Sequence, residues 1–157
     1  MHNFRYTCPT NKVVEKLKWK NFSGRGLVDL QMGCAGGEYY HFTTHGGTYN
    51  GPVECKSRNN YGFQGIQGRE QSHFGIINVA MQCTGSSSWP SSNNNMNGRW
   101  NDKRMCRSGW VITGMEVRQQ TDYGIINFRA RCSELLGKYE IIMNSHQGYG
   151  ILAYTRI

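Results

Sequence analysis

Residues 75–83 are Gly-Ile-Ile-Asn-Val-Ala-Met-Gln-Cys, and two related stretches stand at 26–34 and 124–132. Each begins with glycine, continues with two aliphatic residues and an Asp or Asn, and ends in cysteine. Farther upstream, apolar residues and then a cation recur at equal offsets from that cysteine: Val14, Phe63 and Ile112; Leu17, Ile66 and Met115; Lys20, Arg69 and Arg118. Agreement at so many offsets indicates an internal repeat, and a repeat decides the architecture before local propensity does.

The six cysteines follow the same repeat. An even number of symmetrically placed cysteines, with no Cys-x-x-Cys, is typical of disulfides rather than of reduced thiols or a zinc site. The repeat predicts three disulfides: Cys8–Cys34, Cys55–Cys83 and Cys106–Cys132. We therefore expect an oxidising compartment and a secreted, extracellular protein. Residues 1–6 do not have the pattern of a secretory signal, so we expect the sequence to be a mature form.

The repeat also organises the whole chain. Cutting before the first cysteine of each pair divides a single domain, 1–157, into units 8–54, 55–105 and 106–157. A second alignment stays open, because residues 149–152 resemble residues 123–126. In that alignment the C-terminal segment would be a fourth hairpin without a disulfide.

Local patterns indicate an all-β fold. Lys16, Lys18 and Lys20 alternate with Leu17 and Trp19, which is typical of a half-buried strand. Residues 128–132 alternate in the same way and predict that Arg129 and Arg131 point outward. The polar stretch 84–98, with Trp89 as its one large apolar group, predicts a long, mobile loop.

A threefold pseudo-symmetric β-prism follows from the repeat. Each disulfide staples an antiparallel β-hairpin, and a single four-stranded unit cannot bury its apolar face alone. Three units can bury these faces around a common axis, so that three sheets form the walls of a triangular column.

Two families share features with this chain. The 75–83 stretch and its two relatives, residues 98–106, Gly109 and the Gly-Met-Glu-Val beginning at 114 resemble the repeat of the vitelline membrane outer layer proteins. That resemblance implies a secreted, threefold β-prism that coats eggs or mucosal surfaces and binds oligosaccharides. The dermatopontin family has similarly spaced cysteine hairpins, which implies an extracellular matrix protein, but its Asp-Arg-x-Trp-x-Phe-x-Cys motif is missing here.

Catalysis finds no support in the sequence. The ten acidic residues form no recognisable acid–base pair, and paired cysteines cannot serve as nucleophiles. His41 and His45 lie on an expected strand or loop, where that spacing does not converge on a metal. We expect no enzyme, no cofactor and no metal, with weak oligosaccharide processing as the enzymatic alternative.

The charge of the chain points to anionic partners. With 18 basic and 10 acidic residues the net charge is +8. Such a field attracts acidic polysaccharides or anionic cell surfaces, and secretion makes nucleic acid unlikely. A solvated surface is the structural alternative. The candidate residues for an anionic ligand are Lys16, Lys18, Lys20, Arg99, Lys103, Arg104 and Arg107.

An aromatic residue followed by Asn precedes two of the repeat units, as Tyr49-Asn50 and Trp100-Asn101. A ring offers an apolar face to a sugar and Asn offers a donor and an acceptor. The alternative is that the ring covers the core and Asn forms a turn. In the third unit Tyr149 stands near the same place but lacks the Asn. These five residues are the candidate carbohydrate-binding residues.

The sequence therefore predicts a secreted, lectin-like or coat protein that binds glycans. An oligomer is compatible with this prediction. The alternatives are a dermatopontin-like matrix protein that binds acidic polysaccharide and a membrane-active, pore-forming defence protein. The sequon Asn21-Phe22-Ser23 lies at the expected tip of the first hairpin, where a eukaryotic source would glycosylate Asn21.

Peptide mapping under non-reducing conditions tests the disulfides. We expect each cross-linked peptide pair to join two cysteines of one unit. A cross-link between units, or alkylation of all six thiols without prior reduction, would contradict the stapled-hairpin arrangement.

Overall fold

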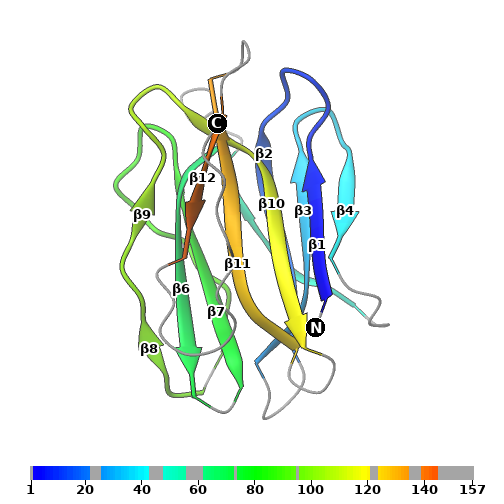
Figure 1. The fold of residues 1–157 in the computed structure, drawn as a ribbon, viewed down its shortest axis with the longest axis vertical. Coiled ribbons are helices and arrows are strands. Elements are labelled where there is room, and N and C mark those ends of the chain that lie inside the picture. Colours follow the sequence, from blue (N-terminus) through cyan, green and yellow to red (C-terminus); the bar gives the residue numbers. More distant parts are fainter. Residues whose placement is uncertain are drawn as a thin grey trace.

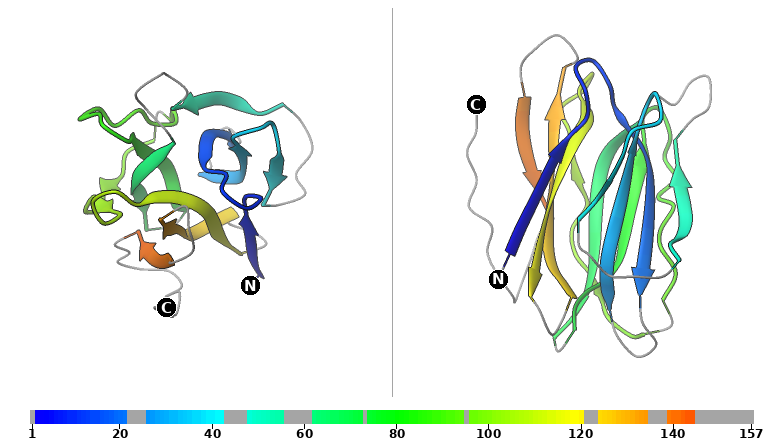
Figure 2. Two further views of the ribbon diagram at one scale, coloured as in Figure 1. Left: turned by 90° about the horizontal axis from the view of Figure 1, so that it is seen from above. Right: turned by 90° about the vertical axis from the view of Figure 1, so that its right-hand side faces the viewer.

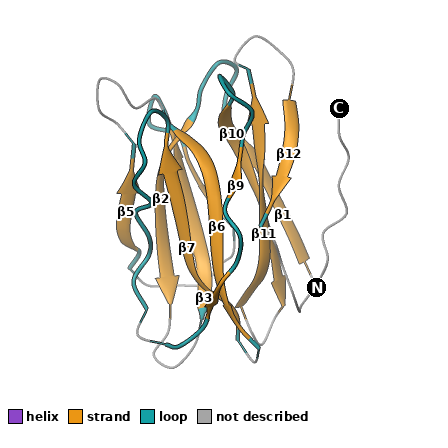
Figure 3. Ribbon diagram, turned by 90° about the vertical axis from the view of Figure 1, so that its left-hand side faces the viewer, coloured by secondary structure: helices purple, strands orange, loops and turns teal. Residues whose placement is uncertain are grey.

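The computed structural model of the chain describes residues 2–21, 26–42, 48–55, 62–72, 74–94, 96–120, 124–134 and 139–144. All regular elements in these ranges are β-strands, and no helix there could cross a membrane (Figure 3). The predicted all-β class is therefore confirmed. The tail from 145 onward, for which the sequence left two alignments open, lies outside the described residues.

Three antiparallel sheets build the molecule (Figure 1). Sheet 1 contains β2 (Val14–Asn21), β3 (Leu27–Cys34), β4 (Tyr39–His41) and β5 (Asn50–Glu54). Sheet 2 contains β6 (Phe63–Gln71), β7 (Gly75–Cys83), β8 (Arg99–Trp100) and β9 (Arg104–Met105). Sheet 3 contains β1 (His2–Thr7), β10 (Val111–Gln120), β11 (Gly124–Ser133) and β12 (Tyr139–Met143). Seen along the axis, the sheets surround a common centre, which is the arrangement of a β-prism (Figure 2).

Each hairpin is completed by the strand that precedes the next disulfide unit. β5 pairs with β2, and β8 and β9 pair with β6. In sheet 3 the strand that precedes the first disulfide unit, β1, pairs with β10. The first described strand thus completes the sheet that holds the third disulfide hairpin. The unit boundaries at 54/55 and 105/106 stay a prediction.

The three central hairpins share their register. Val14 lies opposite Cys34, Phe63 opposite Cys83 and Ile112 opposite Cys132. A register shift follows that pair in every hairpin, and a second shift lies near the other end. The disulfides join the cysteines that the repeat pairs, with Cα atoms 5.7, 5.4 and 5.6 Å apart. Closing loops of this length stabilises the fold by about 3–4 kcal/mol per bridge in the chain-entropy model.

Glycines at the start of β7 and β11, and just before β3, bring the three sheets together at the axis. A Cβ built on Gly26 would lie 2.5 Å from the carbonyl oxygen of Ile76, and one on Gly75 would lie 2.7 Å from that of Ile125. A Cβ on Gly124 would collide with the carbonyl oxygen of Leu27, so the three contacts join sheet 1 to sheet 2, sheet 2 to sheet 3 and sheet 3 to sheet 1. Each sheet therefore touches the next through backbone, where a side chain would not fit.

Apolar side chains from the inner faces fill the space around this contact. Leu17, Ile66 and Met115 occupy equivalent places and are at most 2% exposed. The positions after the buried Asp or Asn are filled by Leu30, Val79 and Phe128, again at most 1% exposed. Removing one such side chain from water stabilises the fold by about 1.5–3 kcal/mol.

The joints between sheets use different chemistry. Between sheets 3 and 1, Tyr6 stacks on Tyr40 with ring centroids 5.1 Å apart and meets Phe42 edge-on at 5.3 Å. Between sheets 3 and 2, the buried Asn144 accepts a hydrogen bond from the backbone N–H of Gly68 at 2.9 Å. The backbone of β6 and the residues after β12 are thereby held together.

The expectation of a mobile loop over 84–98 is wrong for its central part. The backbone N–H of Met81 donates to Pro90 at 3.1 Å, and that of Ser92 donates to Val79 at 2.9 Å. Ser91 forms a bridge with Ala80. Residues 90–92 thus run along β7 as β4 runs along β3, because the edge of β7 offers unpaired backbone groups.

Gly75→Ala tests the backbone contact at the axis. Gly75 has φ +73 and no room for a Cβ, so strain and overpacking together should lower the free energy of unfolding by about 2–5 kcal/mol. Gly109→Ala is the matched control, because Gly109 has φ +83 but nothing within 4 Å of a Cβ. We expect a loss of about 1–2 kcal/mol there, from backbone strain alone. Urea unfolding of both variants measures the difference, and equal losses would contradict it.

Candidate ligand-binding site

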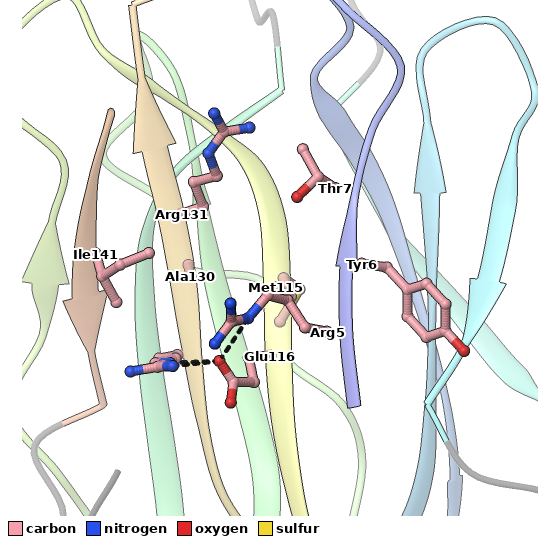
Figure 4. A pocket seen from close by; sticks show the side chains of 9 residues that line it. Arg5, Tyr6, Thr7, Met115, Glu116, Ala130, Arg131 and Ile141 are labelled. Atoms are coloured by element: carbon pink, nitrogen blue, oxygen red, sulfur yellow. Dashed lines mark hydrogen bonds and ion pairs between the residues drawn. The ribbon is translucent and has the colours of Figure 1, made fainter. Parts of the chain in front are cut away.

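A pocket of about 310 Å³ opens on the outer face of sheet 3. Its lining comes from all four strands: Arg5, Tyr6 and Thr7 of β1, Met115 and Glu116 of β10, Arg129, Ala130 and Arg131 of β11, and Ile141 of β12. Figure 4 shows Arg5 reaching across β10 toward Glu116, whereas the ring of Tyr6 turns away toward sheet 1. Charged groups therefore surround a floor of strand backbone.

A buried carboxylate organises the arginines of this pocket. Arg5 lies opposite Glu116 in the sheet, and Glu116 lies opposite Arg129. Arg5 Nε donates to Glu116 Oε2 at 3.1 Å, and Arg129 Nε donates to the same oxygen at 2.7 Å. Arg129 lies on the outer face, as the alternation predicts, but it is only 8% exposed because its guanidinium is bound to Glu116.

The pocket exists because sheet 3 differs from its two counterparts. Phe42, Ser92 and Asn144 make the same backbone hydrogen bond to their sheets, so the residues three positions earlier correspond: Tyr39, Trp89 and Ile141. The ring of Tyr39 lies on the backbone of Gly33, and that of Trp89 lies on the backbone of Gly65. Sheet 3 has the smaller Ile141 instead of a ring, which leaves the outer face open.

A second pocket of about 190 Å³ adjoins the first and shares Thr7 and Arg131 with it. Its lining is mostly polar and lies beside the Cys8–Cys34 disulfide: Cys8, Pro9, Thr10, Asn11, Lys12, Thr113, Ser133 and Glu134. Thr113 Oγ1 and Ser133 Oγ lie 2.8 Å apart. The two pockets together extend along β1, β10 and β11.

Tyr49 belongs to a hydrogen-bonded cluster on sheet 1. Its hydroxyl donates to Asp29 Oδ2 in a short hydrogen bond, and Asp29 Oδ1 accepts from the backbone N–H of Leu30 at 2.7 Å. His41 Nδ1 lies 2.8 Å from the same hydroxyl and donates to it, since the proton of Tyr49 is directed at Asp29. Burial and the bond to Asp29 raise the pKa of Tyr49 well above its ordinary value. The hydroxyl of Tyr49 thus makes hydrogen bonds to Asp29 and His41 within the protein.

The two predicted aromatic-Asn pairs are placed differently. Asn50 is exposed, and its Nδ2 lies 3.5 Å from Asn21 Oδ1. Trp100 is 38% exposed, with the guanidinium of Arg69 5.9 Å from its ring. Asn101 is buried at 4% and donates to Asn144 Oδ1 at 3.3 Å, so it does not face a ligand as expected. Tyr149 lies outside the described residues.

The predicted row of lysines is only partly a surface. Lys20 is 4% exposed, lies opposite Asp29 and holds its ammonium 4.3 Å from the ring of Tyr49, so its expected exposure is wrong. Lys16 donates to the hydroxyl of Tyr39 at 3.4 Å, and this contact raises the pKa of Lys16. Lys18 lies over the same ring at 5.6 Å. The lysines of the predicted anion site thus contact tyrosine side chains, and Lys20 also lies opposite a carboxylate.

The second set of cations lies on and after sheet 2. All four are exposed: Arg99, Lys103, Arg104 and Arg107. Lys103 lies over Trp89 at 5.0 Å and Arg107 over Trp110 at 5.0 Å. These residues stay candidates for an anionic ligand. Asn21 ends β2 and is half-buried, with its Nδ2 3.5 Å from the carbonyl oxygen of Asn93, and its glycosylation stays a prediction.

No group of three His, Cys, Asp or Glu side chains in the described part of the chain could hold a metal ion. The Asp29–Tyr49–His41 cluster is a hydrogen-bonded chain that joins β3, β4 and the segment before β5 in sheet 1.

Comparison with known proteins shows the fold. The crystal structure of a prostate-specific WGA16 glycoprotein lectin (form II) superposes with a TM-score of 0.67 and 12% sequence identity, covering 83% of this chain and 89% of the lectin chain. This likeness is consistent with the β-prism and shows that the fold is one that a lectin uses. No protein-family model matches the sequence, and no curated protein matches it.

The sequence does not predict the outer pocket, because the residues that line it belong to four different strands. The alternation at 128–132 placed Arg129 and Arg131 on one face, which was a usable signal. The correspondence of Tyr39, Trp89 and Ile141 was not visible, since the segments after the second cysteines differ in length and composition. Nothing in the sequence around Glu116 indicates that it lies between two arginines.

Tyr49→Phe tests the buried Asp29 contact. Removing one donor from a buried carboxylate should lower the free energy of unfolding by about 1–3 kcal/mol at neutral pH. The raised pKa of Tyr49 means that the hydroxyl contributes fully below the ordinary tyrosine value of about 10. The difference from wild type should therefore shrink as the pH rises above that value. Urea unfolding at several pH values measures it.

Tyr39→Phe is the control for this prediction. It removes the hydroxyl of an exposed tyrosine in the same sheet and should change stability by less than about 0.5 kcal/mol. If Tyr49→Phe lowered the free energy of unfolding as little as Tyr39→Phe, the Asp29 contact would not stabilise the fold.

Proposed function

We propose that the protein is a secreted, carbohydrate-binding protein of lectin type, without catalytic activity, and that it binds sugar in the outer pocket of sheet 3. Three disulfides are typical of an extracellular protein. The fold is shared with a lectin, although 12% identity carries no residue across. Secretion and a coat-forming role would also agree with the resemblance to the vitelline membrane outer layer proteins.

The observation that carries the proposal is the pocket itself. Sugar sites need a concave surface with convergent donors and acceptors, and a pocket of about 310 Å³ is within the usual size of ligand sites. Arg5, Glu116 and Arg131 supply charged hydrogen-bonding groups, whereas Ile141 supplies an apolar wall for the C–H groups of a sugar ring. The corresponding places on the other two sheets are covered by Tyr39 and Trp89.

The exposed cations favour a second candidate function, binding of acidic polysaccharide as in a dermatopontin-like matrix protein. Arg99, Lys103 and Arg104 lie close in the chain, on or beside the short strands of sheet 2, and the net charge is +8. Attraction through such a field is screened by salt. Binding that disappears in 0.5 M salt would favour this second function. Dye release from liposomes would favour the membrane-active alternative.

Ile141→Trp tests the pocket. Trp89 shows that an indole at this position of the fold lies over glycine, and sheet 3 has Gly114 at the corresponding place, so the variant should fold. We expect wild-type protein to bind sugars on a glycan array. Ile141→Trp should lower the affinity at least about tenfold, equivalent to about 1.4 kcal/mol, by filling the pocket.

Trp89→Ile is the matched control, because it makes the reverse change on sheet 2. It should keep the sugar affinity of wild type. Circular dichroism and thermal unfolding confirm that both variants are folded. Full binding by Ile141→Trp, or loss of binding only in Trp89→Ile, would show that the site lies elsewhere.

A further inference from the structure

The two pockets on sheet 3 share Thr7 and Arg131, so they adjoin each other, and together they are called the groove. Resting on the proposed function, we propose that this groove binds an oligosaccharide with its acidic sugar in the larger pocket and a neutral sugar in the smaller one. The anionic group is a carboxylate or a sulfate ester. The inference rests on the different chemistry of the two pockets.

The larger pocket has an excess of positive charge. Its lining contains three arginines and one glutamate. The lining thus holds more basic than acidic side chains, and such a field attracts an anion.

Arg5 is the group placed to contact the anion. Its Nε is bonded to Glu116 at 3.1 Å, yet its side chain is 69% exposed. Guanidinium carries five N–H donors in a planar fork, so one bond to Glu116 orients the fork and leaves other donors for a ligand. Charge-assisted bonds of this kind suit carboxylates and sulfates. Glu116, only 6% exposed, is a positioning residue for this arginine.

The smaller pocket suits an uncharged sugar. Hydroxyl-bearing residues provide much of its lining: Thr7, Thr10, Thr113 and Ser133. Lys12 and Glu134 bring opposite charges, although Arg131 at the shared boundary adds a positive one on the side of the larger pocket. Sugar hydroxyls donate and accept hydrogen bonds, as these side chains do.

Calorimetric titration of the full disulfide-bonded chain tests the inference. The probes are a disaccharide with one uronic acid, the same disaccharide with that carboxyl reduced to an alcohol, its singly sulfated counterpart, and the uronic acid monosaccharide. The variants are Arg5→Gln and Arg69→Gln. Both remove one positive charge, but Arg69 lies on β6 and is not part of the groove lining. Arg129 remains paired with Glu116 in Arg5→Gln, so that variant should fold.

We expect wild type to bind an acidic disaccharide at least about tenfold more tightly than the neutral one, as a charge-assisted hydrogen bond allows. The uronic and sulfated probes identify which anion is preferred. Arg5→Gln should lose this preference and still bind the neutral disaccharide, whereas Arg69→Gln should keep it. The acidic monosaccharide should bind about tenfold more weakly than the acidic disaccharide, because the second pocket is then empty.

Several results would overturn the inference. One is equal binding of acidic and neutral disaccharides by wild type, with Ile141→Trp still blocking both; the sugar site would then stand and its acidic preference would fall. Equal loss in Arg5→Gln and Arg69→Gln would assign the preference to the general charge of the protein. Equal affinity for monosaccharide and disaccharide would remove the second pocket. Absence of all saccharide binding would overturn the proposed function as well.

Discussion

Contact between backbones at the axis is the constraint on which the molecule depends. Gly26, Gly75 and Gly124 each lie against a carbonyl of the next sheet, in a closed circle of three contacts. This spacing allows the inner apolar side chains to meet, because a Cβ at any of the three places would force the sheets apart. A single four-stranded sheet has no such partner and could not bury its inner face.

The same constraint moves polar function to the outside. The inner faces are filled by apolar side chains at the axis, whereas the Asp or Asn of each hairpin lies opposite a cation on the other face and is buried there: Asp29, Asn78 and Asn127. Each has a different hydrogen-bond partner: Tyr49 for Asp29, Ser92 for Asn78 and Asn144 for Asn127. Variation among the three sheets is therefore greatest at the fourth strand and on the outer face, where a change of one residue opens or closes a pocket.

The sequence predicted the parts of the structure that the repeat encodes. Cysteine pairs, hairpins and the matched positions Leu17, Ile66 and Met115 all follow from it, because equal offsets in sequence become equal places in the three sheets. It predicted the charged side chains less well. Lys20 and Arg129 alternate with apolar residues as exposed cations would, yet each lies opposite an acid on the neighbouring strand. Strand alternation shows the face of a residue but not its cross-strand partner. The pocket depends on such partners, which is why it could not be predicted.

The placement of β1 has a consequence in time. Arg5 and Glu116 are 111 positions apart in the chain, and β1 has no partner in its sheet until β10 exists. At about 5–20 residues per second of synthesis, that interval is roughly 6–22 s. During it, sheets 1 and 2 can form behind a strand that still presents unpaired backbone groups to any other chain. Because three of the residues that line the larger pocket belong to β1, the pocket is completed only when β1 is finally paired with β10.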